Sequence, residues 1–236
     1  MSLETLLEFV RGPLFRLTFA LMLLGLARVL LLDLWGIIEA YRRAGDRRLP
    51  WTLIVSRTLG WLFPVRRLLR IRPIYSTWAV LLHVGLLAVP IFVSQHVRLW
   101  EREIGFRWVA LPRAWAETLT IITIIAGLAI FLGRIGSRQA RAISRKQDYL
   151  WPLVLIVPFV TGFVCANLQV GARLYQASML VHILSGELIF VLLPFTKIAH
   201  CILLPLSQVV STLAWKFPAR VDEDVCITLD KKGAPV

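Results

Sequence analysis

Residues 182–200 read HILSGELIFVLLPFTKIAH, an almost wholly apolar run with a histidine at each end. Read as one α-helix, this run separates His182 and His200 by about five turns, so both side chains project from the same face, about 27 Å apart. That distance is close to the thickness of the hydrocarbon core of a bilayer. A histidine inside a membrane span is costly, and each of the two is therefore a candidate functional residue.

The composition of the chain predicts an all-α integral membrane protein. Of its 236 residues, 58% are hydrophobic, whereas a soluble domain has roughly 45–50%. The net charge of +13 would suggest a nucleic-acid partner in a soluble protein. Here, however, Lys and Arg gather in short loops between apolar spans, which is typical of a membrane topology signal. We therefore expect no nucleic-acid partner.

Five apolar runs are long enough to cross a membrane, since about 20 residues span the hydrocarbon. No internal repeat or linker divides the chain, so we expect one membrane domain over residues 1–236 with a short cytoplasmic tail over 208–236. The expected helices cover residues 15–38, 75–97, 115–133, 149–169 and 179–207.

The distribution of basic residues predicts the orientation of these five helices. Loop 40–74 carries nine Lys or Arg, loop 134–148 carries five and the tail after residue 207 carries four, against seven on the opposite side. Cytoplasmic loops carry the excess of Lys and Arg. The N-terminus is therefore expected outside, the C-terminus in the cytoplasm, and the protein in the inner (cytoplasmic) membrane as a multi-pass protein.

The four histidines of the chain fall at two matching depths in this topology. His83 and His200 each lie seven or eight residues from the inner end of their helices, and His96 and His182 each lie near the outer boundary. The sequence therefore pairs His83 with His200 and His96 with His182. A single membrane histidine could be a packing residue, but four in matched pairs favour ligands.

Two facing imidazoles on neighbouring helices are the ligand set of a b-type haem. Covalent haem attachment and thiolate iron–sulfur sites are disfavoured because the three cysteines form no CxxC motif. The thirteen residues from His83 to His96 correspond to about 220° of helix rotation, so these two do not share a face. A kink or π-bulge at Pro90 could re-aim His96; otherwise His96 is an interfacial residue beside Arg98.

Several stretches resemble a known family. They are FVRGPLF at 9–15, Arg28 in the first span, QDYLWPLVLIVPFVTGF at 147–163, and HILSGELIF…PFTKIAH within 182–200. Together with five spans and histidines on the second and fifth, they resemble the cytochrome b (gamma) subunit of respiratory nitrate reductase. The closer likeness is to the membrane cytochrome b of complexes associated with dissimilatory sulfite reductase and of heterodisulfide-reductase-like complexes.

The resemblance implies a di-haem b membrane subunit. His83 and His200 would ligate the inner haem iron, and His96 and His182 the outer haem iron. Such subunits exchange electrons between the membrane quinone or quinol pool and a cytoplasmic iron–sulfur partner, heterodisulfide-reductase-like or nitrate-reductase-like. The chain would then be a quinone-reactive oxidoreductase subunit, incomplete as a catalyst on its own. The spacing from His83 to His96 is longer than in the nitrate reductase subunit.

Three ionisable residues inside the spans have alternative interpretations. Arg28 is a candidate haem-propionate partner, or it pairs with Asp33. Lys197, three residues before His200, is a second candidate propionate partner, or it extends to the interface. Glu187 could accept a proton from quinol, or it could stay protonated and donate a hydrogen bond to a neighbour.

Two other functional classes stay open from the sequence. The first is a haem-free membrane anchor or transporter, in which the histidines line a proton or metal path. The second is an electron conduit without a quinone site. The basic loops face the cytoplasm and could contact anionic lipid or an acidic peripheral subunit.

Overall fold

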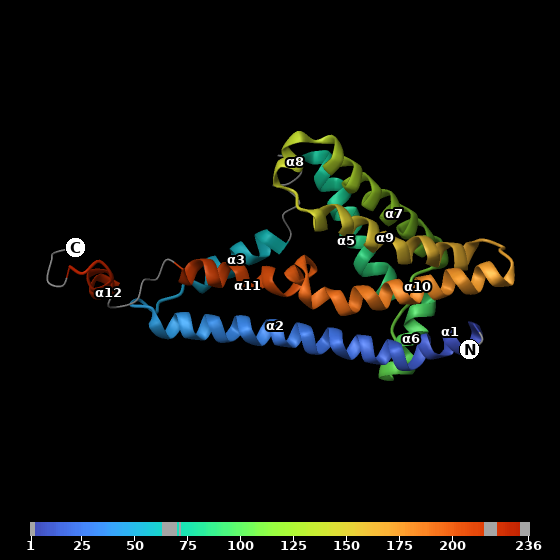
Figure 1. The fold of residues 1–236 in the computed structure, drawn as a ribbon, viewed down its shortest axis with the longest axis horizontal. Coiled ribbons are helices and arrows are strands. Elements are labelled where there is room, and N and C mark those ends of the chain that lie inside the picture. Colours follow the sequence, from blue (N-terminus) through green and yellow to red (C-terminus); the bar gives the residue numbers. More distant parts are fainter. Residues whose placement is uncertain (1–2, 63–69, 71, 215–220, 232–236) are drawn as a thin grey trace. The chain divides into compact units, whose positions relative to one another are not determined.

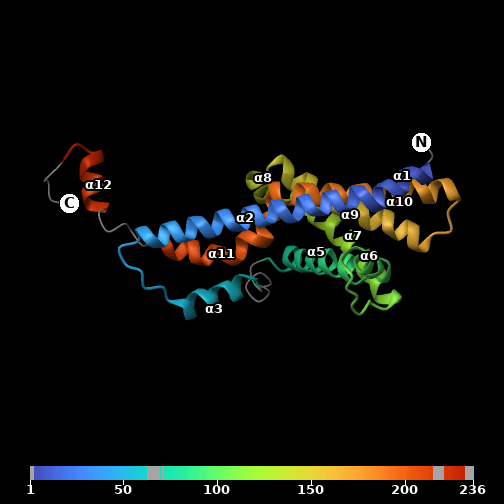
Figure 2. The same ribbon diagram turned by 90° about the horizontal axis from the view of Figure 1, so that it is seen from below.

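The fold is described from a computed structural model that covers residues 3–62, 70, 72–214 and 221–231, and these residues form helices joined by short loops (Figures 1 and 2). The chain divides into two compact units. The first unit comprises residues 1–21 and 65–192, and the second comprises residues 22–64 and 193–236. Residues 63–69 and 71 of the predicted cytoplasmic loop 40–74, and residues 215–220 and 232–236 of the predicted cytoplasmic tail, lie outside the described residues.

Five helices of the structure are long and apolar enough to cross a membrane. Each of the five runs expected from the sequence contributes one of them, which identifies an all-α multi-pass membrane protein. The candidate spans cover Leu3–Arg43, Pro73–Phe92, Arg113–Gly136, Lys146–Asn167 and Ala172–Phe195.

The first unit is a row of closely packed helices. Helix α7 (Arg113–Gly136) packs against α5 (Pro73–Phe92) and α9 (Lys146–Asn167), and α9 packs against α10 (Ala172–Leu192) (Figure 1). Without a hydrophobic driving force in lipid, such contacts depend on small residues that let backbones approach.

Two glycines provide this close approach around α7. A Cβ at Gly85 of α5 would overlap the side chain of Thr123, and a Cβ at Gly127 would overlap that of Ile156 on α9. Thr123 is fully buried, and its hydroxyl donates to the Leu119 carbonyl at 2.6 Å. The hydroxyl therefore needs no partner outside its own helix.

The second predicted helix, 75–97, is wrong as one continuous element. Helix α5 ends at Phe92, Val93 has extended backbone angles (φ −64°, ψ 135°), and α6 (Ser94–Ile104) begins directly after it. Pro90 lies three residues before this break and lacks the N–H that would continue the hydrogen-bond ladder. Of the two alternatives left open for this segment, the structure has an interruption near Pro90. It is a full break at Val93, which places His96 on a separate helix.

The break is stabilised because every carbonyl in the last turn of α5 finds a donor. The last carbonyls of a helix have no partner within it. The Val89 carbonyl accepts hydrogen bonds from the Val93 N–H and from His96 Nδ1. The Pro90 and Ile91 carbonyls accept from Nε1 of Trp100 and Nε1 of Trp108, respectively. The Phe92 carbonyl accepts from the Leu111 N–H. All five donors come from the segment that directly follows α5, so this end of the helix is capped locally.

The first span starts with a π-helical turn. Helix α1 (Leu3–Phe9) leads into the π-helix η1 (Val10–Leu14), and α2 (Phe15–Arg43) follows without interruption. Pro13 lies inside the π-helix. Turns of this kind inside α-helices frequently mark functional sites.

The fifth predicted helix, 179–207, is also wrong as one element. Helix α10 ends at Leu192, two 3₁₀ turns cover Leu193–Phe195 and Lys197–Ala199, and α11 begins at His200 and ends at Leu213. Pro194 removes a backbone donor, and Thr196 is extended, with a hydroxyl that accepts from the Ile198 N–H at 3.4 Å. The inference that His182 and His200 share one helical face is therefore wrong.

The second unit contains the remainder of α2, α3 (Trp51–Leu62), α11 and α12 (Val221–Thr228). Helices α3 and α11 pack together. Gly25 of α2 lies against Pro194, and a Cβ at Gly25 would lie 2.5 Å from the Pro194 Cγ. The absence of a side chain at Gly25 therefore lets α2 approach the broken segment closely.

Candidate metal centre

Two of the four histidines meet in the first unit. The imidazoles of His96 on α6 and His182 on α10 lie with ring centroids 5.9 Å apart and ring planes inclined by 7°. The two histidines are 86 residues apart in the sequence. The break at Val93 is what directs α6 toward α10. This is the pair that matching depth predicts for the outer site.

The hydrogen bonds of these two rings set their tautomers. Nδ1 of His182 lies 2.7 Å from the Pro158 carbonyl of α9, and Nδ1 of His96 lies 3.3 Å from the Val89 carbonyl. A carbonyl only accepts, so each Nδ1 carries the proton and the lone pair is on Nε2. Metal-ligating histidines usually donate their second ring N–H in this way.

A glycine provides the space for the His182 ring. A Cβ at Gly162 on α9 would lie 2.9 Å from Cε1 and 3.0 Å from Nδ1 of His182. Such contacts are too short for unstrained packing. Gly162 therefore lets the ring lie directly on the backbone of α9, where it reaches the Pro158 carbonyl.

The donor set fits an iron held between two imidazoles. Metal–imidazole bonds are about 2 Å long, so two nitrogens on opposite sides of one ion are about 4 Å apart and the ring centres somewhat farther. The 5.9 Å between the centroids of His96 and His182 is a separation of that order. The described part of the chain holds no cluster of three or more His, Cys, Asp or Glu that could bind a metal ion, but a bis-histidine site needs only two.

Protonation of His96 would compete with metal binding, and its surroundings oppose protonation. His96 lies in α6, beyond the apolar span that ends at Phe92. Burial is the main cause that lowers the pKa of His96 to about 4, and the nearby His182 acts in the same direction. The imidazole of His96 is thus neutral at pH 7, as a metal ligand must be.

The inner pair of histidines is divided between the two units. His83 is exposed on α5 and its Nδ1 lies 2.7 Å from the Ala79 carbonyl. His200 is exposed at the start of α11 and its Nδ1 lies 2.9 Å from the Lys197 carbonyl. Both rings therefore have the same tautomer as the outer pair, with the lone pair on Nε2. Their pairing with each other stays a prediction.

A buried carboxylate holds α6 in place, and sequence analysis missed it. The side chain of Glu103 is only 7% exposed and accepts hydrogen bonds from Nε of Arg16 and Nε of Arg102, both at 2.7 Å. The hydrogen bond from Arg16 is the largest cause that lowers the pKa of Glu103. Nη2 of Arg102 also donates to the Arg11 carbonyl at 3.1 Å. Helix α6 is thereby tied to the start of the first span.

An aromatic cluster lies beside this ion pair. Trp100 of α6 contacts Phe15 and Phe19 of α2 with ring centroids 5.8 and 5.1 Å apart. Phe190 of α10 contacts the same two rings at 6.1 and 5.9 Å. The cluster therefore joins α2 to α6 and α10, the two helices that carry His96 and His182.

Glu187 is the most deeply buried charged residue of α10. It is 4% exposed, and neither carboxyl oxygen has a hydrogen-bond partner among the described residues. Glu187 precedes Phe190 by one turn, so it lies on the face of α10 that contacts the start of the first span. Helix α10 also contacts α1 and the π-helix Val10–Leu14. An orphaned carboxyl at such a place needs a ligand, water or proton to satisfy it.

The two predicted propionate partners lie in the second unit. Arg28 is exposed on α2, and among the residues that the structure describes no ion pair joins it to Asp33. Lys197 is exposed in the second 3₁₀ turn. A role for either residue at the inner site stays a prediction.

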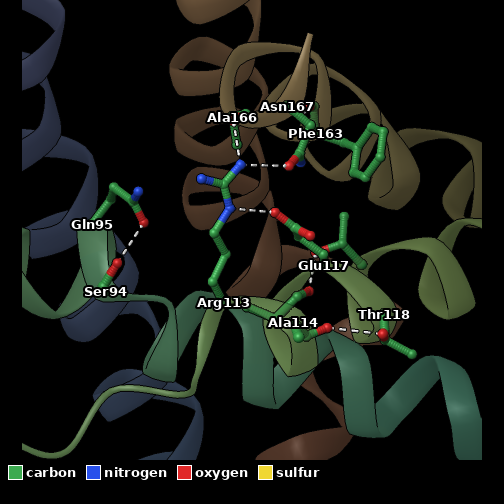
Figure 3. A network of polar contacts seen from close by, with 11 residues as sticks. Ser94, Gln95, Arg113, Ala114, Glu117, Thr118, Phe163, Ala166 and Asn167 are labelled. Carbon is green, nitrogen blue, oxygen red and sulfur yellow. Dashed lines mark hydrogen bonds and ion pairs between the residues drawn. The ribbon is translucent and has the colours of Figure 1, made fainter.

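A second polar network ties α7 to α9 (Figure 3). Nε of Arg113 donates to the Glu117 carboxylate at 2.6 Å, and Nη2 donates to Asn167 Oδ1 at 3.2 Å and to the Ala166 carbonyl at 3.4 Å. The guanidinium thus closes the end of α9, whose last carbonyls lack partners within the helix.

Comparison with known proteins gives one relative. No family model and no solved structure matches the chain. A protein of Nitratidesulfovibrio vulgaris (strain Hildenborough), described by the single word "Protein", is 37% identical over 155 residues, which cover 65% of this chain and 67% of the relative. That description states no activity. The chain belongs to the same protein family as this N. vulgaris protein.

Proposed function

We propose that the protein is a di-haem b membrane subunit of a respiratory redox complex. The observation that carries the proposal is the His96–His182 pair, two imidazoles 5.9 Å apart with both Nδ1 atoms on backbone carbonyls. Bound haem b supplies one-electron transfer. His96 and His182 would hold one group, and His83 and His200 the second. The resemblance to nitrate reductase gamma-type cytochromes supports the same assignment.

The proposed topology has five transmembrane helices with the N-terminus outside and the C-terminus in the cytoplasm. The excess of Lys and Arg in loops 40–74 and 134–148 supports it. His96 and His182 then lie toward the outer face of the cytoplasmic membrane, and the tail and basic loops face a cytoplasmic iron–sulfur partner subunit of the heterodisulfide-reductase-like or nitrate-reductase-like type.

Glu187 is the proposed proton acceptor for quinol oxidation. Its carboxyl is buried without a described partner, and it lies one turn from the aromatic cluster of Phe15, Phe19, Phe190 and Trp100. Aromatic faces suit a quinone ring, and a carboxylate within hydrogen-bond reach of a quinol hydroxyl can take its proton. The chain's own residues would thus bind the ring and hold one proton, and haem held by the histidine pairs would supply the electron acceptor.

Haem content of the purified chain tests the proposal. We expect about two haems b per chain by pyridine-haemochrome quantitation, and the loss of one of them in each of His96→Ala, His182→Ala, His83→Ala and His200→Ala. Gly162→Ala should also weaken the outer site because its Cβ would displace the His182 ring, whereas Gly186→Ala on α10, which has open space, should not. A colourless wild-type protein would reject the cytochrome assignment and favour a haem-free anchor or transporter.

Glu187→Gln tests the quinol step separately. The variant should retain both haems and their spectra, since no histidine is changed, but should lose most of the haem reduction by a quinol analogue. Normal reduction in this variant would show that Glu187 has no part in quinol oxidation, whereas a wild type that the quinol analogue cannot reduce would be an electron conduit without a quinone site.

A further inference from the structure

Arg134, in the last turn of α7, is held differently from Arg113 at the opposite end of the same helix. Arg113 donates to the Glu117 carboxylate (Figure 3). Arg134 instead donates to two neutral hydroxyls, from Nη1 to Ser144 Oγ at 3.3 Å and from Nη2 to Tyr75 OH at 3.2 Å. Its Nε is buried and has no partner among the described residues. Buried charges are normally paired, but no carboxylate among the described residues pairs with this guanidinium.

The two hydroxyls accept hydrogen bonds from Arg134 but carry no negative charge, so they do not neutralise the guanidinium. Ser144 Oγ donates its proton to the Ala140 carbonyl at 2.7 Å, so it meets Arg134 as an acceptor. The Tyr75 oxygen also accepts from Arg134, which directs its own O–H toward a further acceptor. The Arg134 guanidinium with its unused Nε–H and the neighbouring Tyr75 hydroxyl could together donate hydrogen bonds to an oxyanion.

The segment after α7 adds positive charge around this site. Helix α8 (Arg138–Ile143) and the turn that follows it carry Arg138, Arg141 and Arg145, all exposed. The one acidic residue of loop 134–148, Asp148, caps the start of α9 by accepting from the Arg145 backbone N–H at 2.8 Å. The surface around Arg134 therefore attracts anions.

An exposed apolar residue directly precedes each hydroxyl-bearing residue in the chain. Ile74, next to Tyr75, is 76% exposed, and Ile143, next to Ser144, is 80% exposed. Exposed apolar residues close to the ends of membrane spans are suited to contact with acyl chains. The site thus combines an oxyanion cradle with an apolar rim at the level of the headgroups, which matches an amphiphile better than it matches a water-soluble acidic protein.

We propose that Tyr75, Arg134 and Ser144 bind the phosphate of an anionic phospholipid, of the phosphatidylglycerol or cardiolipin class. Basic pockets between transmembrane helices are suited to such headgroups. The site depends on neither the histidine pairs nor the quinol step, and it is complete within the first unit.

Native mass spectrometry of the delipidated full chain, with added phosphatidylglycerol, cardiolipin or phosphatidylcholine, tests this site. We expect retention of the anionic lipids by the wild type, and about tenfold weaker retention in Arg134→Gln, because a charge-assisted hydrogen-bond set is lost. Tyr75→Phe, which removes only one hydroxyl from an exposed ring, should weaken retention less. Arg138→Gln is the matched control, an exposed arginine four residues away with the same charge change. It removes only part of the general positive charge and should weaken retention far less than Arg134→Gln does.

Each alternative source of the anion has its own outcome. Equal weakening by Arg138→Gln and Arg134→Gln would overturn the site in favour of general charge attraction. Equal retention of phosphatidylcholine, or displacement of the lipid by millimolar inorganic phosphate, would overturn its lipid specificity. Unchanged lipid retention in Arg134→Gln together with a shifted haem potential would also overturn the proposal, because the guanidinium would then face a haem propionate.

Discussion

Every histidine of this chain directs Nδ1 at a backbone carbonyl, namely that of Ala79, Val89, Pro158 or Lys197. A carboxylate partner would raise the basicity of the imidazole, whereas a neutral carbonyl orients the ring with a smaller effect on basicity. The tautomer is therefore fixed by backbone geometry, and no side-chain substitution at the partner position can remove it.

The Glu103 ion pair makes the stability of the first unit depend on pH. Because Arg16 lowers the pKa of Glu103 in the folded protein below the ordinary value of 4.5, the stabilisation is fully present above that value and is lost as the pH falls through the lowered pKa. Glu103→Gln should therefore lower the Tm at pH 7, and its Tm should converge with that of the wild type in acid.

The neighbouring carboxylate Glu101 supplies the control for that measurement. Glu101 is 44% exposed and lies 3.7 Å from Arg107, so it forms a surface pair that contributes little. Glu101→Gln should leave the Tm almost unchanged at every pH. A pH-independent difference between the wild type and Glu103→Gln would show that packing, not charge, holds α6.

Among the helices, the α5–α7 contact depends on one missing side chain. A Cβ at Gly85 would overlap Thr123, which is fully buried and has no room to move. Gly85→Ala should therefore destabilise the folded protein by about 1–3 kcal/mol through overpacking. Gly133→Ala, in α7 with nothing near its Cβ, should be neutral or stabilising by up to about 1 kcal/mol.

Thermal unfolding of both glycine variants in the same detergent gives the comparison. A Tm of Gly85→Ala equal to that of the wild type would mean that α5 and α7 are not in this register. The same lowering of the Tm in both variants would point to a general intolerance of alanine.

The five spans could be predicted from the sequence, but the positions of the breaks within two of them could not. Length and hydropathy identify a span because the bilayer demands about 20 apolar residues, and residues 93 and 196 do not interrupt that signal. Val93 and Thr196 are compatible with a helix by themselves. The break after α5 depends on donors such as Trp100 and Trp108, which satisfy the freed carbonyls of Pro90 and Ile91, and a hydropathy pattern carries no sign of these contacts.

The candidate site could likewise be predicted only in part from the sequence. Matching depth alone paired His96 with His182, because topology fixes depth. Glu103 was missed because its partner Arg16 is 87 residues away in sequence, and no local pattern links two exposed-looking charges at that separation. Gly162 was missed for the same reason, since its importance depends on a ring from another helix.

For the whole molecule, the orientation in the membrane can be measured with thiol labelling. In a variant that retains only Cys226, a membrane-impermeant thiol reagent should react in inside-out vesicles and not in intact spheroplasts, because the positive-inside rule places the tail in the cytoplasm. Val109→Cys in a chain without other cysteines should show the opposite pattern, since Val109 is 85% exposed in the loop after α6. Reversal of both patterns would invert the proposed topology.

The local capping of α5 has a consequence for biosynthesis. The donors that close this helix all follow it within twenty residues, so the corner between α5 and α6 requires only short-range contacts, which form early. Chains are inserted and fold from the N-terminus during synthesis. His96 can thus be oriented by the Val89 carbonyl before the ribosome has made α10, and a nascent chain would carry one half of the histidine pair ready for the arrival of the other.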